Sequence, residues 1–371
     1  MSRDWRTALP YYPLLPLGAV IAIVWANTAA ASYFRVAQAL AFPVNEIGVT
    51  FGLASLAQEM LEAIGPGRAV RSSGSIMLPI VIAVGGTLGA AATYAAYLHF
   101  TDEQILLEGW RIACGVDVFV CVALARLIFT RRSAVSVVVL FAVISDVIAL
   151  VLVSHRSFAV GTEAGAITLI VLAVAVSVLF RQVGVRSIWA YVLVAGPTSW
   201  FGCYWSGLHP ALALLPIVPF FPRAPRPLDD LGALRHEHAR VTHFESVFAY
   251  PLQAVAFLFG LANAGVLLRG VDTGTWAVLM ACLVGRPIGI LAAAALLPKP
   301  SLGWAELVVV ALIGSVGLVF AVFLSTSVFP DGPLLTETKL GAMATIVGAP
   351  VAFAVARALR VGRFAQPTGH A

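Results

Sequence analysis

Asp117, Asp146 and Arg286 lie deep inside long apolar runs of this sequence, and Glu59 lies late in another. A charge at bilayer depth costs at least ~2.5–3.5 kcal/mol, so each of them is a candidate functional group. Asp146 stands near the centre of the run FAVISDVIAL, and its short side chain cannot reach a membrane surface from there. Burial disfavours the charged form of a carboxyl group, so this one can exchange a proton for a hard cation such as Na⁺ or Li⁺. The hydroxyl of Ser145 is a candidate to complete an oxygen shell.

The same residues also have a structural interpretation. Asp146 can pair permanently with Arg286 and join two helices, because an arginine stays charged at any working pH. Asp117 follows Gly115 by two residues, and Gly314 and Gly317 stand in a later run. Glycine near mid-span permits an unwound segment, and Asp117 and Arg286 would then offset the partial charges of the broken helix ends. Close helix packing is the alternative use of these glycines.

The composition identifies the elements that must position these residues. Of the 371 residues, 60% are hydrophobic and 11% are charged, against roughly 45–50% and 25% in soluble domains. This excludes a disordered chain, a nucleic-acid binder and a water-soluble enzyme. It indicates an all-α polytopic membrane protein of about twelve spans at about 20 residues each. The apolar runs lie at 12–30, 45–64, 74–98, 110–129, 134–153, 164–181, 187–205, 208–221, 245–268, 275–297, 304–328 and 338–359.

Basic residues favour alternate connections between these runs. The N-terminus, every second connection and the C-terminus hold most of them: Arg3, Arg6, Arg68, Arg71, Arg131, Arg132, Arg181, Arg186, Arg223, Arg226, Arg235, Arg240, Lys299, Arg357, Arg360 and Arg363. By the positive-inside rule, both termini are expected in the cytoplasm. The Pro-rich segment 222–243 suits a cytoplasmic linker. Its His236-Glu237-His238 run is interpreted as an exposed turn rather than a metal site.

Several segments resemble the NhaA family of sodium/proton antiporters. They are SGLHPALA at 206–213, GLANAGVLLRGV at 260–271, VGRPIGI at 284–290, GWRIACGVDVFVCVAL at 109–124, ISDVIALVLV at 144–153 and VNEIGVTFGLASLAQEMLEA at 44–63. The resemblance implies inverted repeats with two broken crossing helices. Residues 73–154 and 272–371 would form the core, and residues 1–72 and 155–271 the panel against which it moves. It also implies a multi-pass protein of the bacterial inner membrane.

The resemblance assigns roles residue by residue. Asp146 would bind the cation and the proton, and Asp117 and Arg286 would lie at the helix crossing. Glu59, His209 and Glu245 match positions tied to pH response. The sequence departs from the family pattern at three site positions: Ser145 replaces a first aspartate, Val116 replaces a threonine, and Arg286 replaces a lysine. One carboxylate beside a permanently charged arginine predicts electroneutral exchange of one cation for one proton. The connection at 31–43 is short, so we expect the hairpin with which some relatives dimerise to be missing. A homodimer is nevertheless among the candidate partners.

Two other functions fit the sequence. The chain can be an NhaA-like scaffold or partner subunit that no longer transports, since Ser145 and Val116 each remove a family oxygen. It can also be an ion-coupled carrier of an organic anion held by Arg286. No nucleophile, metal cluster or phosphate loop indicates an enzyme, and no cofactor or nucleic acid is expected. The expected partners are the transported ions, Na⁺ or Li⁺ and H⁺, and the lipid bilayer.

Overall fold

The computed structural model describes residues 12–64, 73–158, 164–222 and 243–365, and no β-strand occurs in these residues. Six helical stretches in this part of the chain are long and apolar enough to cross a membrane: Ala30–Leu61, Ile76–Thr101, Arg132–Ser154, Gly165–Val183, Thr273–Ala295 and Pro333–Phe364. A seventh is a pair, Trp304–Ile313 and Leu318–Val328, bent by 50°. Shorter apolar helices cover two further predicted runs. The chain is a multi-pass helical membrane protein, as its composition predicts.

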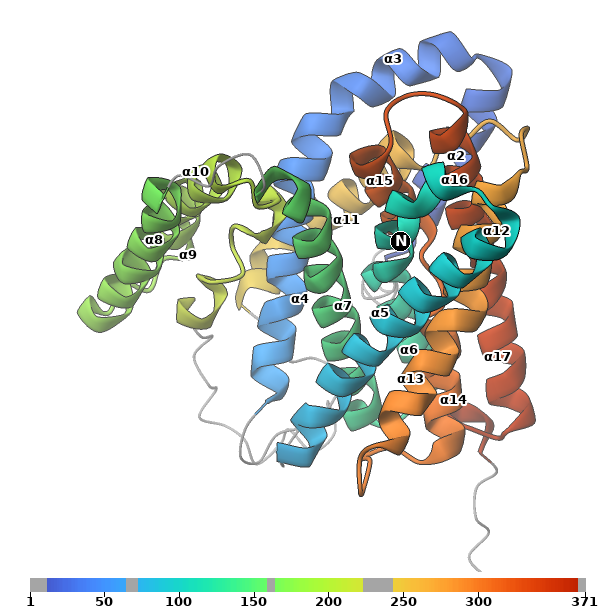
Figure 1. Ribbon diagram of the computed structural model, residues 1–371. Helices are drawn as coiled ribbons and strands as arrows, with labels where there is room; N and C mark the ends of the chain where they lie inside the picture. The colour runs from blue at the N-terminus through green and yellow to red at the C-terminus, as the bar shows by residue number, and fades with distance from the viewer. Residues whose placement is uncertain (1–11, 65–72, 159–163, 223–242, 366–371) are drawn as a thin grey trace, which may run out of the picture.

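The N-terminal helices differ from the sequence expectation. They are α2 (Leu14–Thr28), α3 (Ala30–Ala41), the π-helical η2 (Phe42–Gly48) and α4 (Val49–Ala63). The predicted connection at 31–43 is thus mostly the helix α3, which crosses the top of Figure 1. Its sequence AASYFRVAQALA is rich in strong helix formers and contains neither proline nor glycine. Arg35 and Gln38 interrupt its hydropathy, which is why the sequence favours a connection there.

The run at 208–221 is not a spanning helix, and its prediction as one of twelve spans is wrong. It forms two short 3₁₀ turns, η5 (Pro210–Leu212) and η6 (Val218–Phe220). Pro210, Pro216 and Pro219 each lack a backbone N–H, so a continuous helix would lose its hydrogen bonds here. The elements that precede this segment in the chain stand to one side in Figure 1. They are α8 (Ala164–Val183), α9 (Ile188–Ala190), η4 (Tyr191–Ala195) and α10 (Gly196–Ser206). The predicted linker and its His236-Glu237-His238 run lie outside the described residues, which resume with α11 (His243–Asn263).

The same order of elements occurs twice in the rest of the chain. The first set is α5 (Ser73–Thr101), the 3₁₀-helical η3 (Gln104–Cys114) followed by α6 (Val118–Ile128), and α7 (Arg132–Phe158). The second is α12 (Thr273–Met280), η8 (Ala281–Gly285) and α13 (Arg286–Ala295), then α14 (Trp304–Ile313) with α15 (Leu318–Val328), and last α16 (Pro333–Ala344), η9 (Thr345–Val347) and α17 (Gly348–Ala358). A short 3₁₀ turn, η10 (Gly362–Phe364), ends the described chain. Each set has a helical segment interrupted by a few residues in its middle.

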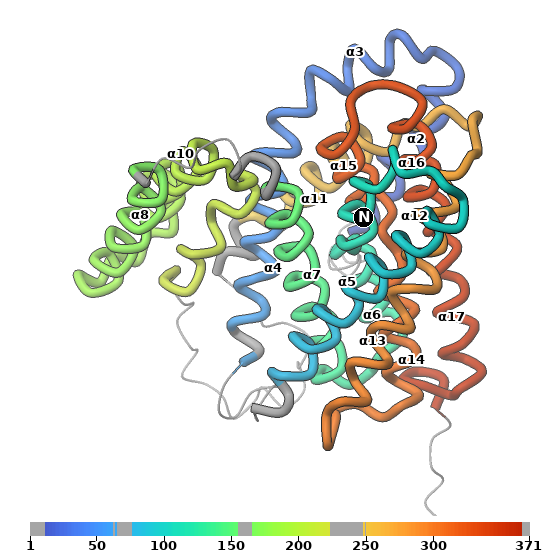
Figure 2. The backbone as a smooth tube through the Cα atoms, in the orientation of Figure 1, coloured from blue at the N-terminus to red at the C-terminus, as the bar shows by residue number. Residues whose placement is uncertain are grey.

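Glycines hold the two sets together where α5 meets α13, which run side by side in Figure 2. A Cβ on Gly89 would lie 2.3 Å from the carbonyl oxygen of Gly285. A Cβ on Gly289 would lie 2.1 Å from the carbonyl oxygen of Gly85. Gly85 and Gly89 are four residues apart, and so are Gly285 and Gly289. This is the small-xxx-small spacing with which membrane helices approach closely. This contact fixes the beginning of α13, and therefore Arg286, relative to the first set.

Candidate ion-binding site

Asp146 lies on α7 beside the interruption between η3 and α6, and it is fully buried. Its Oδ1 accepts a hydrogen bond from the backbone N–H of Val116 at 2.9 Å. Its Oδ2 and the hydroxyl of Ser145 are both buried, and neither has a hydrogen-bond partner among the described residues. Two oxygens from consecutive residues of α7 are therefore buried and without a hydrogen-bond partner among the described residues.

Asp117 joins the two interrupted segments. Its Oδ1 accepts from the N–H of Val120 at 3.2 Å, within the first turn of α6. Its Oδ2 accepts from the N–H of Val319 at 3.1 Å, within the first turn of α15. Its own N–H donates to the carbonyl oxygen of Val316 at 2.9 Å. One buried carboxylate thus faces two helix N-termini, whose partial positive charge it offsets.

Arg286 is buried and begins α13, directly after the π-helical turn η8. Its Nη2 donates to the carbonyl oxygen of Ala113, in the last turn of η3. A cation at this position offsets the negative end of that helix. Within the described part of the chain Arg286 forms no ion pair, and its Nε and Nη1 have no hydrogen-bond partner. The permanent Asp146–Arg286 pair that the sequence left open is thus not formed in this structure.

Thr345 is a site residue that the sequence analysis missed. Its hydroxyl oxygen accepts from the N–H groups of Gly317 and Leu318, each at 3.0 Å, and donates to the carbonyl oxygen of Ala342 at 2.6 Å. A neutral threonine in an apolar run gives no signal, because its hydroxyl usually bonds its own helix. Thr338 does so, donating to the carbonyl oxygens of Leu334 and Leu335.

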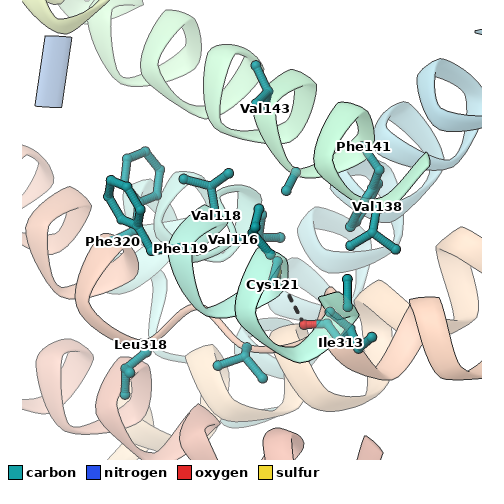
Figure 3. Close-up of a cluster of buried hydrophobic side chains, with 14 of the residues drawn as sticks. Val116, Val118, Phe119, Cys121, Val138, Phe141, Val143, Ile313, Leu318 and Phe320 are labelled. Atoms are coloured by element: carbon teal, nitrogen blue, oxygen red, sulfur yellow. Dashed lines mark hydrogen bonds between the residues drawn. The ribbon is translucent and has the colours of Figure 1, made fainter. Parts of the chain in front are cut away.

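Apolar side chains enclose the crossing, as Figure 3 shows. Val116 and Val118 flank Asp117 and point toward α7, and Phe320 comes from α15. The thiol of Cys121 donates to the carbonyl oxygen of Ile313 at 3.5 Å. The side chain of Val116 contributes no oxygen to the crossing. The polar groups at the crossing are therefore few, and each of them is identifiable.

The three glycines singled out in the sequence lie at the interruptions. Gly115 separates η3 from α6, and Gly314 and Gly317 separate α14 from α15. A Cβ on Gly115 would lie 2.7 Å from the side chains of Leu324 and Phe320. Glycine at 115 therefore serves the close approach of α15 to the first interruption.

Two of the three residues matched to pH response form contacts with residues other than Asp117, Asp146 and Arg286. Glu59 on α4 forms an ion pair with Arg126 of α6 at 2.7 Å. The Nδ1 of His209 accepts from the N–H of Ala211 at 3.2 Å and lies 3.7 Å from Oε2 of Glu46. Glu245 lies in α11, and its side chain is not among those described.

One hydrogen bond near His209 connects it to α7. The backbone N–H of His209 donates at 2.8 Å to the hydroxyl of Ser154, which lies on α7. The Glu59–Arg126 pair likewise joins α4 to α6. Glu46, which the sequence analysis did not single out, becomes noticeable only through its contact with His209.

No group of three or more His, Cys, Asp and Glu residues capable of holding a resident metal occurs in the part of the chain that the structure describes.

The sequence profile of the family described as Na⁺/H⁺ antiporter 1 matches residues 13–357. The chain belongs to this family. A relative named Na(+)/H(+) antiporter NhaA, from Desulfitobacterium hafniense, is 32% identical over 368 residues, covering 94% of each chain. Another of the same name, from Geobacter metallireducens, is 32% identical over 366 residues, covering 93% of this chain and 95% of the relative. The resemblance inferred from the motifs is confirmed, and the family consists of transporters rather than enzymes.

The fold is similar to a solved structure, that of the sodium proton antiporter MjNhaP1 from Methanocaldococcus jannaschii at pH 8. The TM-score is 0.61 at 14% identity, with 94% of this chain and 92% of the other covered. At this identity the likeness concerns the fold alone. The all-helical NhaA-like architecture predicted from the sequence is thus supported by both kinds of comparison.

Proposed function

We propose that this protein exchanges Na⁺ or Li⁺ for H⁺ by alternating access, with Asp146 as the carboxylate that binds either ion. The observation that carries the proposal is the pair of buried, unpartnered oxygens, Oδ2 of Asp146 and Oγ of Ser145. A buried ionised carboxylate needs a compensating charge, and a bound proton or a bound cation can each supply it. Because both ions use the same oxygens, binding of one displaces the other.

The charges around Asp146 support exchange of one cation for one proton. Asp117 is engaged by two backbone N–H groups, one on each side of the crossing. Arg286 remains protonated and therefore carries no transported proton. Asp146 is then the single group at the crossing that changes its charge state, so each cycle moves no net charge.

Alternating access requires the core, residues 73–154 and 272–371, to move against the panel, residues 1–72 and 155–271. The bonds Glu59–Arg126 and His209–Ser154 cross this proposed boundary and are expected to break and re-form during the cycle. The proposal places the protein in the bacterial inner membrane with both termini in the cytoplasm, from the distribution of arginine and lysine. It allows a homodimer, which crosslinking in native membranes would detect.

Purified protein in proteoliposomes tests the proposal. Addition of Na⁺ or Li⁺ outside acid-loaded vesicles should raise the internal pH, as reported by a trapped dye. The rate should be unchanged when a K⁺ gradient with valinomycin imposes a potential, and it should vanish in Asp146→Asn. A strong response to potential would contradict one-for-one exchange.

Ion-binding measurements separate the other functions. If neither Na⁺ nor Li⁺ competes with protons for the purified protein, antiport is excluded. Binding of an organic carboxylate would then indicate the anion carrier, and the absence of any binding would indicate the scaffold.

A further inference from the structure

We infer that Thr345 is a positioning residue of the ion site, which sets the start of α15 and, through it, the place of Asp117 and Asp146. The inference rests on the proposed antiport, since it specifies how the second interruption supports the ion-binding carboxylate. Thr345 touches neither carboxylate, so its influence passes through the backbone of residues 316–319.

The contacts form a continuous path. Thr345 accepts from the N–H groups of Gly317 and Leu318. The residues on either side of this pair bond Asp117: Val316 through its carbonyl oxygen and Val319 through its N–H. The residue before Asp117, Val116, donates its N–H to Asp146. A displaced α15 start therefore moves the backbone that holds Asp146.

Thr345 also has the place in the second set of helices that Asp146 has in the first. Asp146 lies on α7, which ends the first set, and Thr345 begins η9, between α16 and α17 at the end of the second. Asp146 accepts one N–H group at the interruption of its set, and Thr345 accepts two. The separation is 30 residues between Val116 and Asp146, and 28 between Gly317 and Thr345. The two sets thus use the same contact, but the first uses a carboxylate and the second a hydroxyl. The hydroxyl satisfies the helix start without adding a second group whose charge can change.

The backbone at this point needs external support. Leu318 has φ of 27°, which is in the left-handed region that side-chain-bearing residues rarely adopt. Such a conformation persists only where the surroundings hold it, and such residues cluster at functional sites. The bond from its N–H to Thr345 is one of the contacts that hold it.

Three variants of the full-length protein test the inference. Thr345→Val keeps the side-chain shape and removes the hydroxyl, Thr345→Ser keeps the hydroxyl, and Thr338→Val removes a hydroxyl that bonds only within α16. We expect Thr345→Val to raise KM for Na⁺ about tenfold, because two buried N–H groups lose their acceptor. Thr345→Ser and Thr338→Val should keep the wild-type KM within about twofold, because both retain a hydroxyl at position 345.

Three outcomes would overturn the inference. They are a wild-type KM in Thr345→Val, an equal loss in Thr345→Ser, and an equal loss in Thr338→Val. The serine variant keeps the test decisive even if the valine variant fails to fold, because its impairment would contradict a role for the hydroxyl.

A second measurement does not depend on transport. Hydrogen–deuterium exchange of the peptide covering residues 314–320 should be faster in Thr345→Val than in wild type and Thr338→Val. Unchanged exchange would overturn the inference. If the wild-type protein shows no cation-driven proton flux, the proposed antiport fails, and this exchange experiment still decides whether Thr345 holds α15.

Discussion

The two interrupted helical segments solve one physical problem with different chemistry. Each leaves helix ends with unsatisfied backbone groups in a buried apolar environment. At the first, Asp117 faces the start of α6, Arg286 faces the end of η3, and Asp146 takes a further N–H group. At the second, the hydroxyl of Thr345 takes two N–H groups, and a single oxygen of Asp117 takes the third. Ionisable groups are thus concentrated at one interruption.

This difference indicates where ion exchange can occur. The start of a helix needs a hydrogen-bond acceptor, which a hydroxyl can be, whereas exchange of a cation for a proton needs a group whose charge can change. The first interruption has such a group in Asp146, whereas the second fixes the position of the start of α15. Four substitutions test this division, in order of decreasing expected effect.

Asp146→Asn should abolish exchange, because the amide keeps the shape of the carboxyl group but carries no negative charge that a proton or a cation could neutralise. Dye-reported proton flux in proteoliposomes should fall to the level of empty vesicles. Size-exclusion chromatography in detergent should show an intact protein. Retained flux in an intact variant would remove Asp146 from the proposed role and erase the contrast between the interruptions.

Asp117→Asn should reduce flux severely without removing the ion-binding carboxylate. An amide has one acceptor oxygen, so it can satisfy the N–H of Val120 or of Val319 but not both. An unsatisfied buried N–H costs about 1–3 kcal/mol, which corresponds to a loss of roughly tenfold to a hundredfold. The rate at saturating Na⁺ is the measurement. Flux equal to wild type would show that Asp117 is not needed to join the two helix starts.

Arg286→Gln should have an intermediate effect, since a partner charge at a helix end is worth about 0.3–2 kcal/mol. Glutamine keeps an amide donor but brings no charge. We expect a loss of thermal stability. Because the energy involved is small, we also expect the flux to fall only a few-fold. Arg286→Lys, which restores a cation, should recover most of both. Equal defects in the two variants would argue for the shape of arginine and against its charge.

Gly115→Ala should have the smallest effect on flux, because it changes packing and removes no charge or hydrogen bond. The added methyl group would lie 2.7 Å from Leu324 and Phe320, so α15 must shift away from the first interruption. Overpacking of this kind costs typically about 1–3 kcal/mol, measurable as a lower melting temperature. Gly165→Ala is the matched control, because a Cβ there meets no atom within 4 Å. A stable Gly115→Ala protein would show that the two interruptions need not approach so closely.

Much of the site could be predicted because a charge in an apolar run is conspicuous whatever its neighbours are. Asp146, Asp117 and Arg286 were identified in this way, and the glycines at 115, 314 and 317 lie where the helices are interrupted. The run at 208–221 was misjudged for the converse reason. Its hydropathy suits a membrane span, but three prolines prevent the helix that a span requires.

The sequence by itself determined the membrane class, the family and the few ionisable residues that transport would need, because these follow from residue type and local spacing. Only the tertiary structure decided how those residues are used. Asp117 accepts a hydrogen bond from the N–H of Val319, which is 202 residues away in the sequence. Arg286 donates to the carbonyl oxygen of Ala113, which is 173 residues away, and does not pair with Asp146. Thr345 gains its role solely from the approach of Gly317 and Leu318. The physical reason is that the cost of burying a charge follows from the apolar run around it, within one helix. A hydrogen bond to a helix end exists only once two distant segments have packed together.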